Sequence, residues 1–157
     1  MATQEEPNII AIANGALAEC QRQQVGFDEY IGLLKAYQGA LYAQKRIPHF
    51  NDLYILAMTI DPKTEGCYRL VPVTFANGGN ASTHETIYQN MERLFQFLDK
   101  TTDPYEWVRS FLSIHPFIDG NGRCAWILYN WLSHALNNPV PLPDFKFGEI
   151  PMPDMER

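Results

Sequence analysis

Hydrophobic and polar positions in the N-terminal third follow the period of an α-helix. Apolar residues recur at helical spacing over residues 9–20 and again over residues 27–41, with a break near Gly26. A shorter pattern of the same kind follows over residues 51–56. We therefore expect three helices in this part of the chain, and their apolar faces indicate packing rather than chemistry.

The second half of the chain contains three further helical patterns. One has its apolar residues on a single face between Ile87 and Leu98, and another begins at Asp103-Pro104, where an N-cap and a first-turn proline favour a helix start. The third, from Cys124 to Leu136, is apolar over most of its surface, which is typical of a central buried helix. Residues 137–157 are too rich in proline for a helix, so this tail is expected to lie extended on the surface or to fray.

One segment, from Tyr68 to Phe75, favours a β-strand instead, because it is rich in β-branched and aromatic residues. Pro72 cannot donate a ladder hydrogen bond, which confines such a strand to a sheet edge. The Asn-Gly-Gly-Asn string at residues 77–80 is typical of a turn, so a small β-hairpin is predicted. An exposed hairpin edge can pair with an extended peptide. A hairpin that merely covers the core is the alternative.

Composition is that of one folded domain. The 157 residues include 46% hydrophobic and 13% aromatic residues, so we expect a single domain over residues 1–157 with a sizeable core. The formal net charge of −6 and the lack of a basic patch argue against a nucleic-acid partner. No apolar run is long enough to span a membrane, and the three cysteines form no metal-binding pattern. A cytoplasmic protein is expected, with secretion as an effector left open.

The chemistry-bearing residues gather in the nine-residue string His115-Pro116-Phe117-Ile118-Asp119-Gly120-Asn121-Gly122-Arg123, between two predicted helices. Gly120 and Gly122 can adopt positive φ, so the N–H groups around Asn121 can form an anion-binding nest at the N-terminus of the second helix. Phe117 is expected to point inward and anchor the loop. The arrangement favours a phosphorylated ligand.

Each polar side chain of this string has a physical role in such a site. Asp119 can hold Mg²⁺ together with phosphate oxygens. Arg123 is poorly placed for the helix dipole, which favours a bound anion as its partner. His115 has an ordinary pKa near neutrality and can act as a general base toward a hydroxyl. The simpler interpretation is a helix-to-helix turn with a surface His, Asp and Arg.

The same string resembles the motif of the Fic (Fic/Doc, or Fido) family, which reads His, any residue, Phe, any residue, Asp or Glu, Gly-Asn-Gly-Arg, two free positions and a second Arg. The resemblance implies a mainly α fold, a helical bundle with a small β-hairpin flap over the active site. It also implies Mg²⁺-dependent transfer of a nucleoside monophosphate, typically AMP from ATP, to a Ser, Thr or Tyr hydroxyl of a protein. His115 would then be the base, Asp119 the Mg²⁺ ligand, residues 120–122 the phosphate nest and Arg123 a phosphate clamp.

A second likeness lies upstream. Gly66-Cys67-Tyr68-Arg69 resembles the start of the Fic flap, which aligns the target peptide by strand pairing. The likeness implies that Tyr68, Arg69, Leu70 and Val71 form the target-docking flap. The resemblance covers about residues 51–136, which would be the motif-bearing core of the domain.

The chain departs from the family where Trp126 stands in place of the second arginine. An indole has one N–H and no charge, so it cannot hold a terminal phosphate as an arginine does. Three alternatives stay open: ATP held without that contact, another donor such as UTP or CDP-choline, or a degenerate domain that binds a nucleotide or a protein without catalysis. A Trp126 that simply packs in the core is expected on structural grounds. The family's autoinhibitory string, a Ser or Thr followed four residues later by Glu and then Gly or Asn, was not found in the chain.

Overall fold

The computed structural model describes residues 6–75 and 80–145 and is mainly α-helical. The helices, in chain order, are α1 (Ile9–Arg22), α2 (Phe27–Ala43), α3 (Phe50–Ile60), the short 3-10 helices η1 (Pro62–Thr64) and η2 (His84–Thr86), α4 (Ile87–Gln96), α5 (Pro104–Ile114) and α6 (Asn121–Leu132). Each helical pattern of the sequence corresponds to one of the six α-helices. Within the described residues, no helix combines the length and the apolarity needed to cross a bilayer.

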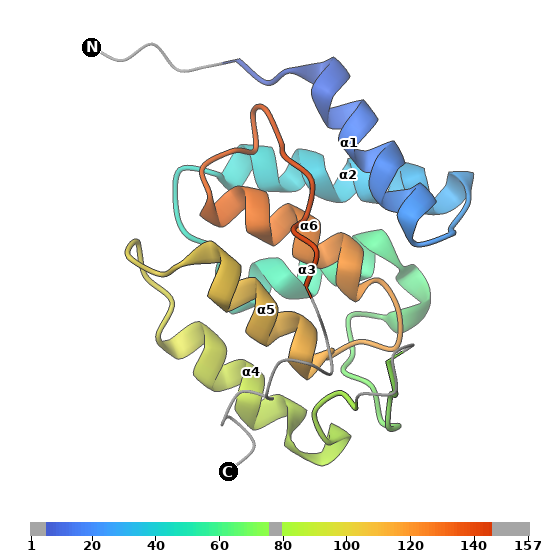
Figure 1. Ribbon diagram of the computed structural model, residues 1–157, viewed down its shortest axis with the longest axis vertical. Coiled ribbons are helices and arrows are strands. Elements are labelled where there is room, and N and C mark those ends of the chain that lie inside the picture. The colour runs from blue at the N-terminus through green and yellow to red at the C-terminus, as the bar shows by residue number, and fades with distance from the viewer. Residues whose placement is uncertain (1–5, 76–79, 146–157) are drawn as a thin grey trace.

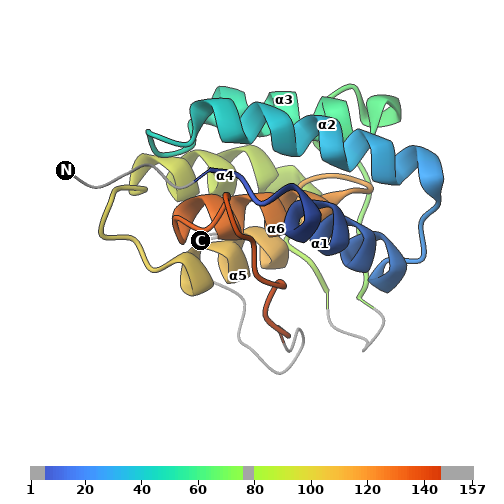
Figure 2. The same cartoon turned by 90° about the horizontal axis from the view of Figure 1, so that it is seen from above.

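Helix α6 is the centre of the bundle, as its nearly all-round apolar surface predicts. It packs against α5 on one side and against α1, α2 and α3 on the other (Figure 1). Seen from above, α2 and α3 form one layer of the bundle, and α5 lies beyond α6 on the opposite side (Figure 2). The side chains of Trp126, Ile127 and Leu128 are completely buried. The helix ends at Leu132, a few residues before the expected end near residues 137–139.

The residues at the start of α5 explain why the helix begins there. The side chain of Asp103 accepts a hydrogen bond of 3.1 Å from the backbone N–H of Tyr105, and Pro104 occupies the first turn, where its missing N–H has no cost. Trp107, Val108 and Phe111 then form the apolar face that packs toward the core. This helix delivers the chain to His115.

The strand predicted over residues 68–75 does not form. The only pairing among the described residues of this segment is an isolated antiparallel bridge between Thr74 and Asn80, beside a hydrogen bond of 3.0 Å from Ala81 N–H to the Val73 carbonyl. The prediction was wrong: Arg69 is buried, and its guanidinium binds the carbonyl of Val71, which a regular strand would pair with a neighbouring strand. Apart from Asn80, the turn predicted at residues 77–80 lies outside the described residues.

The described part of the C-terminal tail contains no helix, as expected, but it does not simply lie on the surface. Leu142 and Phe145 are buried, and the carbonyl of Val140 accepts hydrogen bonds from the side chains of Trp126 and Asn130. The tail therefore closes one side of the core next to α6. Residues 146–157 lie outside the described residues.

Candidate active site

The loop from His115 to Arg123 joins the end of α5 to the start of α6, as the sequence predicts. His115 is the C-cap of α5 in the left-handed conformation, with φ of 52°, and its N–H donates a 2.9 Å hydrogen bond to the Phe111 carbonyl. Gly120 is the N-cap of α6 with φ of 84°, a conformation that favours glycine. The chain reverses direction within six residues, and the N-terminus of α6 faces the end of α5.

Asn121 holds this loop in shape. Its Oδ1 atom accepts a 2.9 Å hydrogen bond from the N–H of Phe117, and its Nδ2 atom donates one of 2.7 Å to the carbonyl of the same residue. Asn121 is 2% exposed and Phe117 is 1% exposed. Phe117 also contacts Tyr68, with ring centroids 5.7 Å apart. Phe117 is therefore the inward-pointing anchor that was predicted, and the Asn121 side chain shapes the loop from within.

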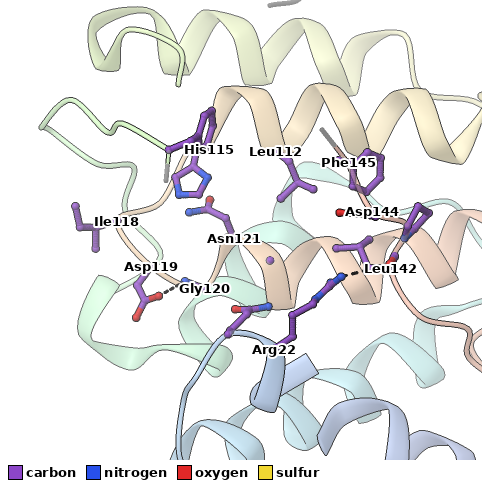
Figure 3. Close-up of a pocket in the computed structure, with 14 residues that line it drawn as sticks. Arg22, Leu112, His115, Ile118, Asp119, Gly120, Asn121, Leu142, Asp144 and Phe145 are labelled. Atoms are coloured by element: carbon purple, nitrogen blue, oxygen red, sulfur yellow. Dashed lines mark hydrogen bonds between the residues drawn. The ribbon is translucent and has the colours of Figure 1, made fainter. Parts of the chain in front are cut away.

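A cavity of about 310 Å³ opens beside the loop (Figure 3). It combines polar groups of the loop with apolar side chains of α5 and the C-terminal segment. Its lining comprises Arg22, Gln23, Phe75, Leu112, His115, Ile118, Asp119, Gly120, Asn121, Gly122, Leu142, Pro143, Asp144 and Phe145. His115, Asp119 and the three nest residues thus share one cavity, although Arg123 is absent from its wall.

His115 contributes a neutral imidazole to the cavity. Burial and the nearby Arg69 guanidinium lower its pKa to about 4, and the Leu112 carbonyl and the Asp119 carboxylate oppose this shift only in part. Its ring stands edge-on to Phe75, with centroids 5.4 Å apart. Within the described part of the chain, its buried Nδ1 atom has no well-formed hydrogen bond. At neutral pH the imidazole is therefore unprotonated, which is the form that a general base requires.

Asp119 is the acidic group of the loop. Its side chain is 62% exposed, and its Oδ1 atom accepts a 2.8 Å hydrogen bond from the N–H of Gly120. Among the described residues, no group of three or more His, Cys, Asp or Glu side chains could hold a metal ion. A single accessible carboxylate does suit Mg²⁺, which is held in many phosphate sites by one or two carboxylates, phosphate oxygens and water.

Arg123 lies beneath the nest rather than at its mouth. Its side chain is completely buried, and its Nη2 atom is 3.4 Å from Oδ1 of Asp119. Within the described structure, its Nε and Nη1 atoms have no hydrogen-bond partner. A buried guanidinium with most of its donors unsatisfied is costly unless an anion compensates its charge. Arg123 therefore makes the underside of the nest strongly electropositive.

Six of the fourteen residues that line the cavity were not expected from the sequence. Arg22 and Gln23 come from the end of α1, and residues 142–145 come from the C-terminal segment. The amide of Gln23 lies directly against α6, since a Cβ atom on Gly122 would be only 2.5 Å from Gln23 Nε2. No local pattern points to these residues, because they are about 90 or more positions away from the loop or lie in a segment that was expected to be peripheral.

Comparison with known proteins decides the family. The model of the Fic/DOC family matches residues 45–133, which is more than half of the chain. The chain belongs to the Fic/DOC family. A Fido domain-containing protein of Dictyostelium discoideum is 37% identical over an alignment of 89 residues, and the match covers 51% of this chain and 62% of that protein. This chain therefore spans less than two thirds of that relative.

Solved Fic structures share the fold. A variant of Fic-1 from C. elegans superposes with a TM-score of 0.63 at 19% identity, over 87% of this chain and 51% of that one. A Fic domain containing signaling protein from Bacteroides thetaiotaomicron has a TM-score of 0.51 at 26% identity, over 69% of this chain and 46% of that one. The matched part of this chain spans about half of each of these solved chains.

Trp126 belongs to the core. It is completely buried, its Nε1 atom donates a 3.0 Å hydrogen bond to the Val140 carbonyl, and its ring lies 5.1 Å from that of Tyr37. A Cβ atom on Gly15 would come within 2.7 Å of the indole, so α1 approaches α6 closely at this point. The indole fills space between helices and is not part of the cavity wall.

The four residues predicted for the Fic docking flap differ in how far they are exposed to solvent. Leu70 and Val71 are 85% and 47% exposed, whereas Arg69 is 3% exposed. Tyr68 is partly buried and contacts Phe117 and Tyr88, and its hydroxyl is buried without a hydrogen-bond partner in the described structure. Only Leu70 and Val71 therefore present a surface to another molecule.

Proposed function

We propose that this Fic domain transfers a nucleoside monophosphate, AMP from ATP, to a Ser, Thr or Tyr hydroxyl of a target protein in a Mg²⁺-dependent reaction. The Fic family is known for nucleotide transfer to proteins, and this supports the coarse class. The observation that carries the proposal is the placing of a neutral His115 imidazole beside the N-terminus of α6 in one cavity, with the buried Arg123 behind it held, among the described residues, only by Asp119.

In this proposal the nest binds the phosphates of the donor. The N–H groups at the start of α6 and the positive charge of Arg123 below them attract anions to Gly120, Asn121 and Gly122. The Asn121 amide is committed to Phe117, so it keeps the backbone N–H groups in position. A preorganised set of donors of this kind stabilises the charge that develops during transfer without reorganising.

His115 acts on the target. The hydroxyl oxygen forms a bond to the α-phosphorus while the bond from that phosphorus to the pyrophosphate oxygen breaks, and the hydroxyl proton passes to the imidazole. Because the His115 pKa lies near 4, the ring is unprotonated at pH 7, as a general base must be. Asp119 would hold the Mg²⁺ ion, which supplies positive charge to the phosphates.

The protein substrate is proposed to dock along Leu70 and Val71, the exposed part of the docking flap. The partners in this proposal are a nucleotide and a protein with an accessible hydroxyl, with neither nucleic acid nor a membrane involved. The proposed location is the cytoplasm.

A second candidate function is binding of a nucleotide or a partner protein without catalysis. Trp126 favours it, because the charge of the second Fic arginine is missing and an indole fills its position. A further alternative is that the site transfers a group from UTP or CDP-choline, without the charge of that arginine.

A labelled-donor assay tests the proposal. Purified protein is incubated with a cell lysate, Mg²⁺ and labelled ATP, UTP or CDP-choline, with His115→Ala as the paired sample. We expect label from ATP on one or more proteins, and a loss of about 100-fold or more in the variant. Titration calorimetry with the same nucleotides separates the candidates, since binding without transfer supports the non-catalytic domain. Transfer that persists in His115→Ala would refute the assigned role of the imidazole.

A further inference from the structure

The cavity wall carries two carboxylates, so a polyphosphate can bind there only if a cation on the wall offsets its negative charge. Among the side chains that line the cavity, Asp119 and Asp144 are acidic and Arg22 is the one permanent cation, because His115 is neutral and Arg123 is not at the wall. A triphosphate carries several negative charges and needs positive partners. We infer that Arg22 binds the leaving-group phosphates of the donor, an inference that rests on the proposed function.

Arg22 is held in place over the cavity from two sides. Its Nη2 atom donates to both carboxylate oxygens of Glu19 at 2.8 Å, and its Nη1 atom donates to the Leu142 carbonyl at 3.4 Å. Glu19 is 4% exposed, whereas the side chain of Arg22 is 45% exposed. Within the described residues the Nε atom has no hydrogen-bond partner, so an anchored guanidinium keeps donors available for an anion.

The position of Arg22 relative to the nest follows from its neighbour. Gln23 Nε2 would be 2.5 Å from a Cβ atom on Gly122, so the end of α1 lies against the first turn of α6. Figure 3 shows that His115 and Arg22 enter the cavity from different sides, His115 from the end of α5 and Arg22 from α1. A phosphate bound at the N-terminus of α6 therefore lies between these two elements.

The direction of the reaction assigns Arg22 to the leaving group. In an in-line displacement the leaving oxygen departs opposite the attacking oxygen. His115 receives the proton of the attacking hydroxyl, so the hydroxyl approaches from the α5 side. The pyrophosphate then departs toward α1, where Arg22 stands. A charge-assisted contact of this kind is expected to strengthen ATP binding by about 10- to 100-fold.

The test distinguishes the contribution of the Arg22 guanidinium to ATP binding from the effect of disturbing the Glu19 carboxylate that holds it. Replacing Arg22 alone would leave Glu19 buried without its partner, so the informative comparison is Glu19→Gln against the double variant Glu19→Gln/Arg22→Gln. Arg109→Gln removes an equal charge from an exposed pair with Glu106 on α5 and serves as the control. Titration calorimetry measures the affinities for ATP and AMP with Mg²⁺, and circular dichroism verifies that each variant is folded.

We expect the double variant to bind ATP about 10- to 100-fold more weakly than Glu19→Gln, with AMP affinity changed by less than about threefold. Arg109→Gln should bind both nucleotides as the wild type does. Equal ATP affinities of the single and double variants would overturn the role of Arg22. The proposed function would still stand in that case if the Glu19→Gln variant transfers label and loses this activity when His115 is also replaced. An equal loss for AMP and ATP would refute the assignment to the leaving group. A wild type that neither binds nor transfers a nucleotide would overturn both.

Discussion

The Nε atom of Arg69 donates a 2.6 Å hydrogen bond to the backbone carbonyl of His115. The same guanidinium donates to the carbonyls of Ile114, Val71 and Ser82. Arg69 is 3% exposed, and its cation lies at the C-terminus of α5, where the helix dipole favours positive charge. One buried side chain thus connects the docking flap, the segment before α4 and the backbone of His115.

Arg69→Lys should therefore lower stability and transfer together. A lysine has one nitrogen and cannot reach the same set of carbonyls, so at least one buried acceptor is left unsatisfied at a cost of about 1–3 kcal/mol. The free energy of unfolding in urea measures this change. Arg109→Lys, in an exposed ion pair, is the matched control and should change stability by less than about 0.5 kcal/mol. If the two lysine variants are equally stable, the bonds of Arg69 contribute nothing of consequence.

The His115 pKa predicts a loss of stability in mild acid. Its value in the folded protein is about 4, below the ordinary 6.5, so the unfolded chain takes up a proton first as the pH falls. The resulting stability is present above pH 6.5 and is lost between pH 6.5 and 4, a change on the order of 3 kcal/mol.

Urea unfolding across this pH range measures the effect in the wild type and in His115→Asn, since asparagine tolerates the left-handed backbone of this position. The variant should lose less stability on acidification than the wild type. His134→Asn, at an exposed left-handed position, controls for the substitution itself. If the free energy of unfolding changes with pH in the same way in the wild type and in His115→Asn, the lowered pKa of His115 is contradicted.

Restoring an arginine at position 126 should not restore a Fic phosphate clamp. The indole is completely buried between Gly15 and Tyr37, so Trp126→Arg places an unpaired charge in the core. We expect a loss of at least about 3 kcal/mol in thermal or urea unfolding and no gain in ATP affinity. Trp126→Phe keeps most of the apolar contact and loses the hydrogen bond to Val140, at about 1–2 kcal/mol. An arginine variant as stable as the wild type would show that α1 and α6 can separate at this point.

Asn121→Ala should loosen the loop before it affects any ligand contact. The substitution leaves the N–H and the carbonyl of Phe117 without their partners in a buried place, at a cost of about 2–4 kcal/mol. Transfer should fall with stability, because the nest N–H groups are no longer held in position. Asn51→Ala on the exposed surface of α3 is the control, and the two variants are compared by urea unfolding and by the labelled-donor assay. An unchanged stability for Asn121→Ala would refute its role in shaping the loop.

Helices and the loop were predictable because their determinants are local. Apolar residues at helical spacing, the Asp103-Pro104 start and the glycine at position 120 act over a few residues each, so the chain reveals them without its partners. The strand prediction at residues 68–75 failed for the opposite reason. Its composition favours β-structure, but the burial of Arg69 among carbonyls from distant segments decides its conformation.

Local patterns in the chain were sufficient to predict the six α-helices of the described residues, the tight loop between the last two and the family resemblance of that loop. Which side chains complete the cavity depends on long-range packing, because Arg22 lies about a hundred positions from the loop and reaches it through the contact of α1 with α6. The same packing also decides that Arg123 lies under the nest and that Trp126 faces the core. Periodicity assigns residues to a helix face, but what that face meets depends on how all the helices pack together.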